Sequence, residues 1–235
     1  VNVFISLQEK YRKRKRWERH METERKPIDY TLEELLLLSE NQEKNVQYAI
    51  GFYYEHGIKT EKSPAAALLW YERAAKQGHA DAQLRLGLMY AQGNGCLQDF
   101  KEAFKWLKKS ADQGNANAQY NLGRCYEEGL GVSKDISKAI ACFTKAAKKE
   151  DYRAVCSMGT YYMLGIGVEQ NDKKAFQCFE KAANAGIAVG QYNLAVMYLY
   201  GSGVEKNEEK GMEWLKKAAQ QDFAPAVKAL ENNEL

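Results

Sequence analysis

An internal repeat of 36 residues is the feature that most constrains how this chain folds. In each copy a small residue is followed by tyrosine three residues later and by glycine three residues after that. The five tyrosines are Tyr54, Tyr90, Tyr126, Tyr162 and Tyr198. The copies fill residues 48–227 without an insertion. A period of this length is typical of helical units that stack side by side.

Each copy contains the pattern of two short helices joined by a turn. In copy two, Ala82, Leu86 and Tyr90 recur at a spacing of four residues, which places them on one face of a helix. Gly93 follows this stretch and suits a left-handed helix C-cap. A second amphipathic stretch begins after a residue that favours helix N-termini, such as Asp135 in copy three. The pattern predicts one helix-turn-helix unit per copy.

A small residue recurs inside the predicted first helix. The column reads Gly51, Gly87, Gly123, Gly159 and Ala195. Glycine in a helix interior costs about 1 kcal/mol relative to alanine. Its recurrence therefore predicts that the two helices of a unit cross too closely for a Cβ atom.

Stacking of these units predicts an all-α fold. One helix pair cannot bury its own apolar stripe, whereas neighbouring copies bury it between them and form an α-solenoid. Thr31 and Glu34 match a capping box, so we expect an N-terminal capping helix within residues 27–47. The first-helix pattern restarts at residues 224–232, and we assign residues 228–235 to a C-terminal cap.

The unit resembles the Sel-one-like repeat, a relative of the tetratricopeptide repeat. The match is close over residues 116–123, Ala-Asn-Ala-Gln-Tyr-Asn-Leu-Gly, and over residues 129–135, Gly-Leu-Gly-Val-Ser-Lys-Asp. The resemblance implies a right-handed superhelix of five helix-turn-helix repeats whose first helices line a concave groove. It also implies an adaptor or scaffold without catalytic residues, although such a fold does not identify the partner. Copy one departs at Lys59 and Thr60, where we expect a remodelled turn.

The candidate partner site consists of variable positions on the predicted first helices. Aromatic, arginine and asparagine side chains there can bind a peptide or helix of another protein by stacking and bidentate contacts. The residues are Tyr48, Phe52, Arg85, Leu88, Tyr120, Asn121, Arg124, Arg153, Tyr192 and Asn193. Arg85, Asn121 and Arg153 resemble the carboxylate clamp of tetratricopeptide domains. The alternative is that polar residues such as Asn121 and Asn193 brace the scaffold, since exposed polar side chains are the ordinary protein surface.

The positive charge of the chain is concentrated at one end. The formal net charge is +3, but residues 1–26 hold nine basic and four acidic residues, a net +5, so the rest carries −2. The basic cluster is Arg12, Lys13, Arg14, Lys15 and Arg16. Residues 10–19 could anchor the chain to an anionic membrane or nucleic acid while the repeats recruit a partner. We favour the other interpretation, in which residues 1–26 form a solvated helical extension that packs its apolar side on the first cap.

Catalytic and metal-binding patterns are missing from the sequence. The three histidines lack the H-E-x-x-H spacing, and the five cysteines form no C-x-x-C pair. We expect no catalytic residue, metal, cofactor or small-molecule substrate, and we interpret Cys142 and Cys178 as small buried replacements for tryptophan. The apolar runs are too short for a membrane-spanning helix. The cysteine pattern and the lack of a recognisable signal segment favour a cytoplasmic location.

Overall fold

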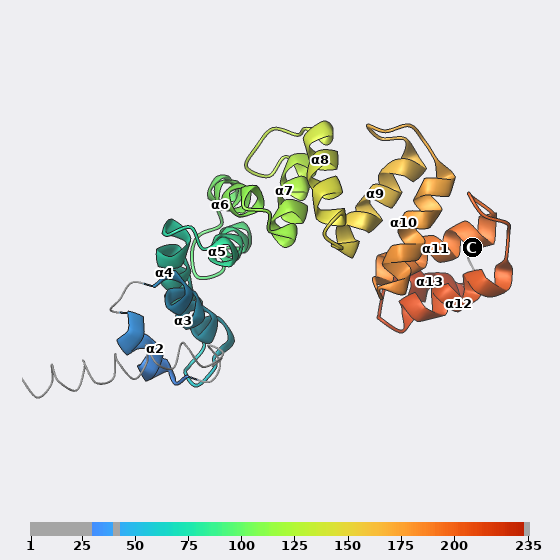
Figure 1. The fold of residues 1–235 in the computed structure, drawn as a ribbon. Helices are drawn as coiled ribbons and strands as arrows, with labels where there is room; N and C mark the ends of the chain where they lie inside the picture. The colour runs from blue at the N-terminus through green and yellow to red at the C-terminus, as the bar shows by residue number, and fades with distance from the viewer. Residues whose placement is uncertain (1–29, 40–42, 233–235) are drawn as a thin grey trace, which may run out of the picture. The chain divides into compact units, whose positions relative to one another are not determined.

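The computed structural model describes residues 30–39 and 43–232. The regular elements in these residues are α-helices, as the sequence predicts (Figure 1). The chain divides into two compact units between Asp99 and Phe100. This division falls inside copy two of the repeat, between its first and its second helix.

The first unit, coloured blue to green in Figure 1, is built from consecutive helices that pack on one another. Its described helices are α2 (Leu32–Leu38), α3 (Lys44–His56), α4 (Pro64–Lys76) and α5 (Ala80–Gln92). The core between α2 and α3 is apolar and includes the buried Leu35, Ile50 and Tyr53. The Tyr53 hydroxyl group also donates a hydrogen bond to the carbonyl oxygen of Tyr30 at 2.8 Å, which ties the residues before α2 to the first repeat.

The second unit repeats the same arrangement, and each helix packs on the next one along the chain. Its helices are α6 (Phe100–Asp112), α7 (Ala116–Glu128), α8 (Ile136–Ala147), α9 (Tyr152–Leu164), α10 (Asp172–Asn184), α11 (Ala188–Tyr200), α12 (Glu208–Ala219) and α13 (Ala224–Asn232). Apolar side chains from neighbouring helices form the core between copies, with Phe143 and Phe179 fully buried. The restart of the first-helix pattern at residues 224–232 corresponds to α13.

The helix ends follow the signals in the sequence. At α2, the Thr31 backbone N–H donates to Glu34 Oε2 at 2.8 Å and the Glu34 backbone N–H donates to Thr31 Oγ1 at 3.2 Å, so the predicted capping box is confirmed. Asp135 accepts from the backbone N–H of Lys138 at 2.9 Å at the start of α8. Each first helix ends at a glycine with φ between 67° and 79°, the left-handed region that glycine adopts without strain. These glycines are Gly57, Gly93, Gly129, Gly165 and Gly201.

The glycine inside the first helix permits the close helix crossing that the sequence predicts. A Cβ atom on Gly123 would lie 2.7 Å from the ring of Phe143, and a Cβ atom on Gly51 would lie 2.7 Å from the ring of Tyr71. Gly159 faces Phe179 in the same way. In all three cases the ring belongs to the second helix of the same copy and is completely buried. The prediction of a close crossing is therefore confirmed in copies one, three and four.

The turn of copy one keeps the backbone conformation of the other copies. Lys59 stands where the others have a glycine, yet its φ of 54° is in the same left-handed region as the φ of 78° at Gly95. A Cβ atom on Gly95 would lie 2.6 Å from the backbone of Pro64 in the preceding copy. No earlier repeat copy precedes copy one. The Lys59 side chain extends toward α2, where its Nζ donates to the carbonyl oxygen of Tyr30 at 3.1 Å. The expectation of a remodelled turn at Lys59 is wrong.

Buried glutamines connect copies two, three and five to the preceding copy. Gln119 Nε2 donates to the carbonyl oxygen of Ala111 at 3.3 Å, and Gln191 Nε2 donates to Ala183 at 3.4 Å. Each bond satisfies a carbonyl group at the C-terminal end of a second helix, where no intrahelical partner remains. Sequence analysis gave these glutamines no role, although they recur in the repeat motif.

The side-chain oxygen of the buried glutamine is bonded in copy five but not in copy three. Gln221 Nε2 donates both to Gln191 Oε1 at 2.8 Å and to the carbonyl oxygen of Gly186 at 3.0 Å. Two repeats earlier, the position of Gln221 is occupied by Lys149, whose Nζ donates to the carbonyl oxygen of Gly114. Gln119 Oε1 is buried without a hydrogen-bond partner. The substitution of lysine for glutamine at position 149 accounts for this unsatisfied acceptor.

Candidate partner-binding face

The predicted site residues all lie on first helices, but they are divided between the two units. Tyr48, Phe52, Arg85 and Leu88 belong to α3 and α5 of the first unit, and all four are half-buried. The others belong to α7, α9 and α11 of the second unit: Tyr120, Asn121, Arg124, Arg153, Tyr192 and Asn193. Each of these six is at least partly exposed. The basic residues 12–16 lie outside the described residues.

In the first unit, Arg85 lies beside a carboxylate that also binds a tyrosine. Tyr71 donates its hydroxyl hydrogen to Glu55 Oε2 at 2.5 Å, and Arg85 Nη1 lies 3.6 Å from Glu55 Oε1. Burial, together with the hydrogen bond and the negative charge of Glu55, raises the pKa of Tyr71 far above its ordinary value. Tyr71 is therefore a neutral donor, and Glu55 is the anion that faces Arg85.

Ring contacts hold the two predicted aromatic residues of the first unit. The ring of Tyr48 stacks on His79 with centroids 4.5 Å apart, and the ring of Phe52 is tilted against His56 with centroids 4.1 Å apart. His79 Nδ1 accepts a hydrogen bond from the backbone N–H of Ala82 at 3.2 Å and thereby caps α5. Burial lowers the pKa of His79, which agrees with a neutral ring that accepts at Nδ1.

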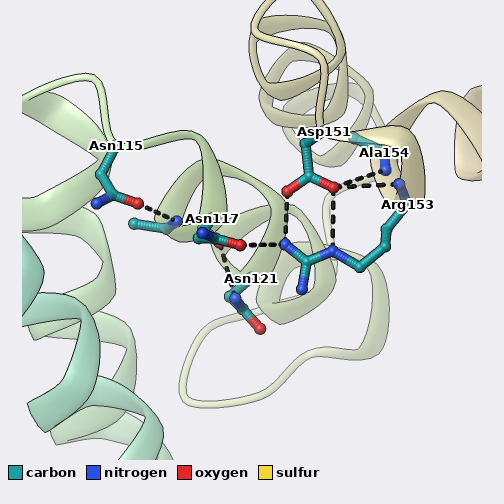
Figure 2. A network of polar contacts seen from close by, with 7 residues as sticks. Asn115, Asn117, Asn121, Asp151, Arg153 and Ala154 are labelled. Carbon is teal, nitrogen blue, oxygen red and sulfur yellow. Dashed lines mark hydrogen bonds and ion pairs between the residues drawn. The ribbon is translucent and has the colours of Figure 1, made fainter. Parts of the chain in front are cut away.

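In the second unit, Arg153 connects two neighbouring copies (Figure 2). Its Nε donates to Asp151 Oδ1 at 3.0 Å and its Nη2 donates to Asp151 Oδ2 at 2.5 Å, a bidentate pair. Nη2 also donates to Asn117 Oδ1 on α7, and the guanidinium lies 4.5 Å from the ring centroid of Tyr120. The hydrogen bonds to Asp151 raise the pKa of Arg153. The predicted residues Tyr120 and Arg153 are thus brought into direct contact.

Asp151 was not among the predicted site residues. Besides binding Arg153, it caps α9 by accepting from the backbone N–H groups of Arg153 at 3.1 Å and Ala154 at 3.4 Å. A preference for aspartate at helix N-caps could have identified the cap. The pair with Arg153 depends on a side-chain rotamer and leaves no periodic signal.

The remaining predicted residues of α7 also have intramolecular partners. Asn121 Nδ2 donates to the carbonyl oxygen of Asn117 at 2.7 Å, one turn earlier. Arg124 donates to Glu128 Oε1 through Nε at 2.9 Å and through Nη2 at 2.5 Å, which raises the pKa of Arg124. Arg85, Arg124 and Arg153 therefore each lie next to a carboxylate of the same chain. A carboxylate clamp stays a prediction, and it would require Arg85 and Arg153 to exchange an internal partner for the ligand.

Contacts between α9 and its two neighbours define one continuous surface of the second unit. Tyr161 on α9 donates its hydroxyl hydrogen to Glu127 on α7 at 2.7 Å. On the other side, Cys156 of α9 packs in one apolar core with Leu194 and Met197 of α11. Tyr192 packs on Phe223, with ring centroids 5.5 Å apart. We call the exposed and half-buried side chains of α7, α9 and α11 the first-helix face.

The cysteines do not form a reactive site. All five are free thiols, and burial raises the pKa of Cys125 to about 11 and that of Cys156 to about 12. Such thiols are poor nucleophiles at neutral pH because little thiolate is present. Cys142 and Cys178, which were interpreted as small buried replacements for tryptophan, are half-buried. In the same column Trp70 and Trp214 are half-buried, whereas Trp106 is buried.

Within residues 30–39 and 43–232, no group of three or more His, Cys, Asp and Glu side chains could hold a metal ion. None of the described helices is long and apolar enough to cross a membrane.

The geometry defines a class of protein, an α-solenoid of helix-turn-helix repeats that carries an aromatic and polar surface on its first helices. The Sel1 repeat model matches residues 45–79, 80–115, 116–151, 153–187 and 188–223. The chain belongs to the Sel1 repeat family. The matched repeats begin at residue 45 and end at residue 223, whereas the period in the sequence placed them at 48–227.

Two solved structures show the same fold with related sequences. A Sel1 repeat protein from Oxalobacter formigenes is 32% identical, with a TM-score of 0.79 over 85% of this chain and 80% of that chain. The protein c5321, described as a protective antigen of uropathogenic Escherichia coli strains with an SLR fold, is 33% identical, with a TM-score of 0.76. That match covers 83% of this chain and 42% of c5321.

One curated protein matches over a much shorter region. Chitin synthase regulatory factor 3 of Schizosaccharomyces pombe is 52% identical over 40 residues, which are 17% of this chain and 4% of that protein. The likeness therefore concerns little more than one repeat. Sel1 repeat proteins are generally protein-interaction scaffolds, and the family is typically non-enzymatic.

Proposed function

We propose that this chain is a non-enzymatic scaffold that binds a peptide or helix of a partner protein on the first-helix face. The observation that carries the proposal is the contact of Arg153 with Asp151, Asn117 and Tyr120, which spans two copies. This contact fixes side chains that would otherwise lose rotamer freedom on binding. A surface ordered in advance binds with a smaller entropic cost.

The composition of the face supports a protein partner. Tyrosine and arginine are enriched among residues that dominate binding energies at protein interfaces. Tyr120, Arg124, Arg153 and Tyr192 lie on three consecutive first helices and are at least partly exposed. The equivalent residues of the first unit, on α3 and α5, are candidates for a second contact region.

A capture experiment with matched variants tests the proposal. The full chain, an Asn121→Ala/Arg124→Ala variant and a Lys145→Ala/Lys181→Ala variant serve as baits, and the captured proteins are quantified by mass spectrometry. Asn121 and Arg124 lie on α7, and their side-chain bonds stay within that helix. Lys145 and Lys181 are exposed on the second helices α8 and α10, so their variant is the control.

We expect the first variant to lose a protein that wild type and the control retain, while the melting temperatures of all three stay within a few degrees. The proposal is contradicted if both variants capture the same proteins as wild type. A partner lost only by the control would place the binding surface on the second helices.

A further inference from the structure

The first-helix face changes its chemistry from one copy to the next. One stripe of α7 consists of Asn117, Asn121, Arg124 and Glu128, which are all polar and are bonded to groups of the same chain. The corresponding stripe of α9 reads Arg153, Ser157, Thr160 and Leu164. On α11 the same positions are Val189, Asn193, Val196 and Tyr200, which we call the α11 stripe. Polar groups therefore give way to apolar ones along the unit.

The α11 stripe carries exposed apolar side chains at both of its ends, Val189 and Tyr200, with the half-buried Asn193 and Val196 between them. Its spacings of four, three and four residues place its members on one side of the helix. Tyr200 is 63% exposed and Val189 is 39% exposed, and Leu164 at the end of α9 is 55% exposed. With Ile166, these are four of the six large hydrophobic side chains that are exposed in the described residues. An exposed group of this kind on a soluble helix indicates an interaction surface.

The electrostatics of the stripe restrict what can cover it. α11 contains no Asp, Glu, Lys, Arg or His, and the arginine at the corresponding stripe of α9 is already paired with Asp151. A charged ligand group buried here would lose its hydration without gaining a partner. The complementary surface is therefore uncharged and apolar.

The stripe also discriminates between backbone conformations of the ligand. An extended peptide needs hydrogen-bond partners for its backbone groups, but Val189, Val196 and the aliphatic edge of Leu164 provide none. The polar groups of the stripe are the Asn193 amide and the Tyr200 hydroxyl, which lie seven residues apart on α11 and cannot pair the successive backbone groups of an extended segment. A helix satisfies its own backbone and presents only side chains, at the spacing that suits packing against another helix.

We infer that the segment bound on the first-helix face is an amphipathic α-helix of a partner protein, whose uncharged apolar stripe packs on Val189, Val196, Tyr200 and Leu164. This inference rests on the proposed function and narrows it from a peptide or helix to a helix with apolar anchors at positions i, i+3 or i+4, and i+7. The α11 stripe spans about 16 Å, which corresponds to about three helical turns.

Selection from a random peptide library against the full chain tests the inference. The displayed peptides have about 16 residues, enough for roughly four turns of helix. Counter-selections use a Val189→Lys/Tyr200→Lys variant, which places charge on the α11 stripe, and a Leu97→Lys variant. Leu97 is 91% exposed in the turn after α5, so its variant controls for general adhesion to apolar side chains. Circular dichroism verifies that both variants keep their helix content.

We expect the selected peptides to carry apolar residues at helical spacing. A synthetic consensus peptide should bind the Val189→Lys/Tyr200→Lys variant at least about tenfold more weakly than wild type, and should bind the Leu97→Lys variant as tightly as wild type. Selected peptides that are acidic or lack helical spacing, and that depend on Asn121 and Arg124 instead, would overturn the inference and leave the proposed function intact. Peptides that are indifferent to both sets of residues would overturn both. Stripe-dependent self-association in sedimentation velocity would identify a second copy of this chain as the occupant, and so would refute a separate partner.

Discussion

Replacing Gly123 by alanine tests whether close helix crossings stabilise the repeats. The added Cβ atom would lie 2.7 Å from Phe143 Cε1, and Phe143 is fully buried, so its ring has no free space to enter. Overpacking of this kind costs about 1–3 kcal/mol, whereas alanine gains about 1 kcal/mol in helix propensity over glycine. We expect the free energy of unfolding to fall by up to about 2 kcal/mol, measured by urea denaturation followed by circular dichroism.

A second substitution at the contact gives the matched control. Copy five has alanine at the equivalent position, Ala195, and its core partner is Leu215 instead of a phenylalanine. The double variant Gly123→Ala/Phe143→Leu recreates this pair in copy three. Its loss of stability should be smaller than the sum of the two single losses by about 1 kcal/mol. A Gly123→Ala variant that is more stable than wild type, or strict additivity of the two changes, would refute the close crossing as the reason for the glycine column.

Three further predictions concern separate parts of the chain. Lys149→Gln should raise the free energy of unfolding by about 1 kcal/mol, because glutamine can keep the bond to Gly114 and also donate to Gln119 Oε1. Gln221 makes the two equivalent bonds in copy five, to Gly186 and Gln191. Unchanged stability in urea would contradict this prediction. Because the pKa of His79 is lowered in the folded chain, the unfolded state takes up a proton first as pH falls, so stability should decrease below about pH 6.5. His79→Asn should make this decrease smaller in denaturation at about pH 7.5 and 5.5, since Asn115 caps α7 by the same contact; an equal decrease would exclude His79 as its source. Replacing residues 12–16 by glutamine in the full chain separates the two hypotheses for that segment. An anchor predicts salt-sensitive binding to anionic vesicles or to RNA that the variant loses, and a solvated extension predicts no binding to either probe by either protein.

The repeat pattern predicts the helices well because it reports local backbone preferences and burial. The capping box at Thr31, the left-handed glycines such as Gly129 and the crossing at Gly123 each depend on a few neighbouring positions and recur every 36 residues. The tolerance of Lys59 in a glycine position was not predictable in this way, because it depends on a bond to Tyr30 that only the first copy makes.

The candidate site was predicted less completely than the fold. The residues Tyr120 and Arg153 were identified and are in contact, but Asp151, which holds Arg153, was missed. Position in the repeat indicates which side chains reach the surface, whereas the choice of hydrogen-bond partner depends on rotamers and on the neighbouring copy. The pairing of Arg85, Arg124 and Arg153 with carboxylates of the same chain depends on such rotamers. Because these charges are already paired, the apolar α11 stripe is the better candidate for a ligand contact.

Hydrogen–deuterium exchange of the full chain, with and without a captured partner, most directly tests whether a partner binds on the first-helix face. Binding on the first-helix face predicts slower exchange in α9 and α11 of the second unit, because these helices would be covered by the partner. Protection confined to the second helices α8, α10 and α12 would contradict binding on the first-helix face.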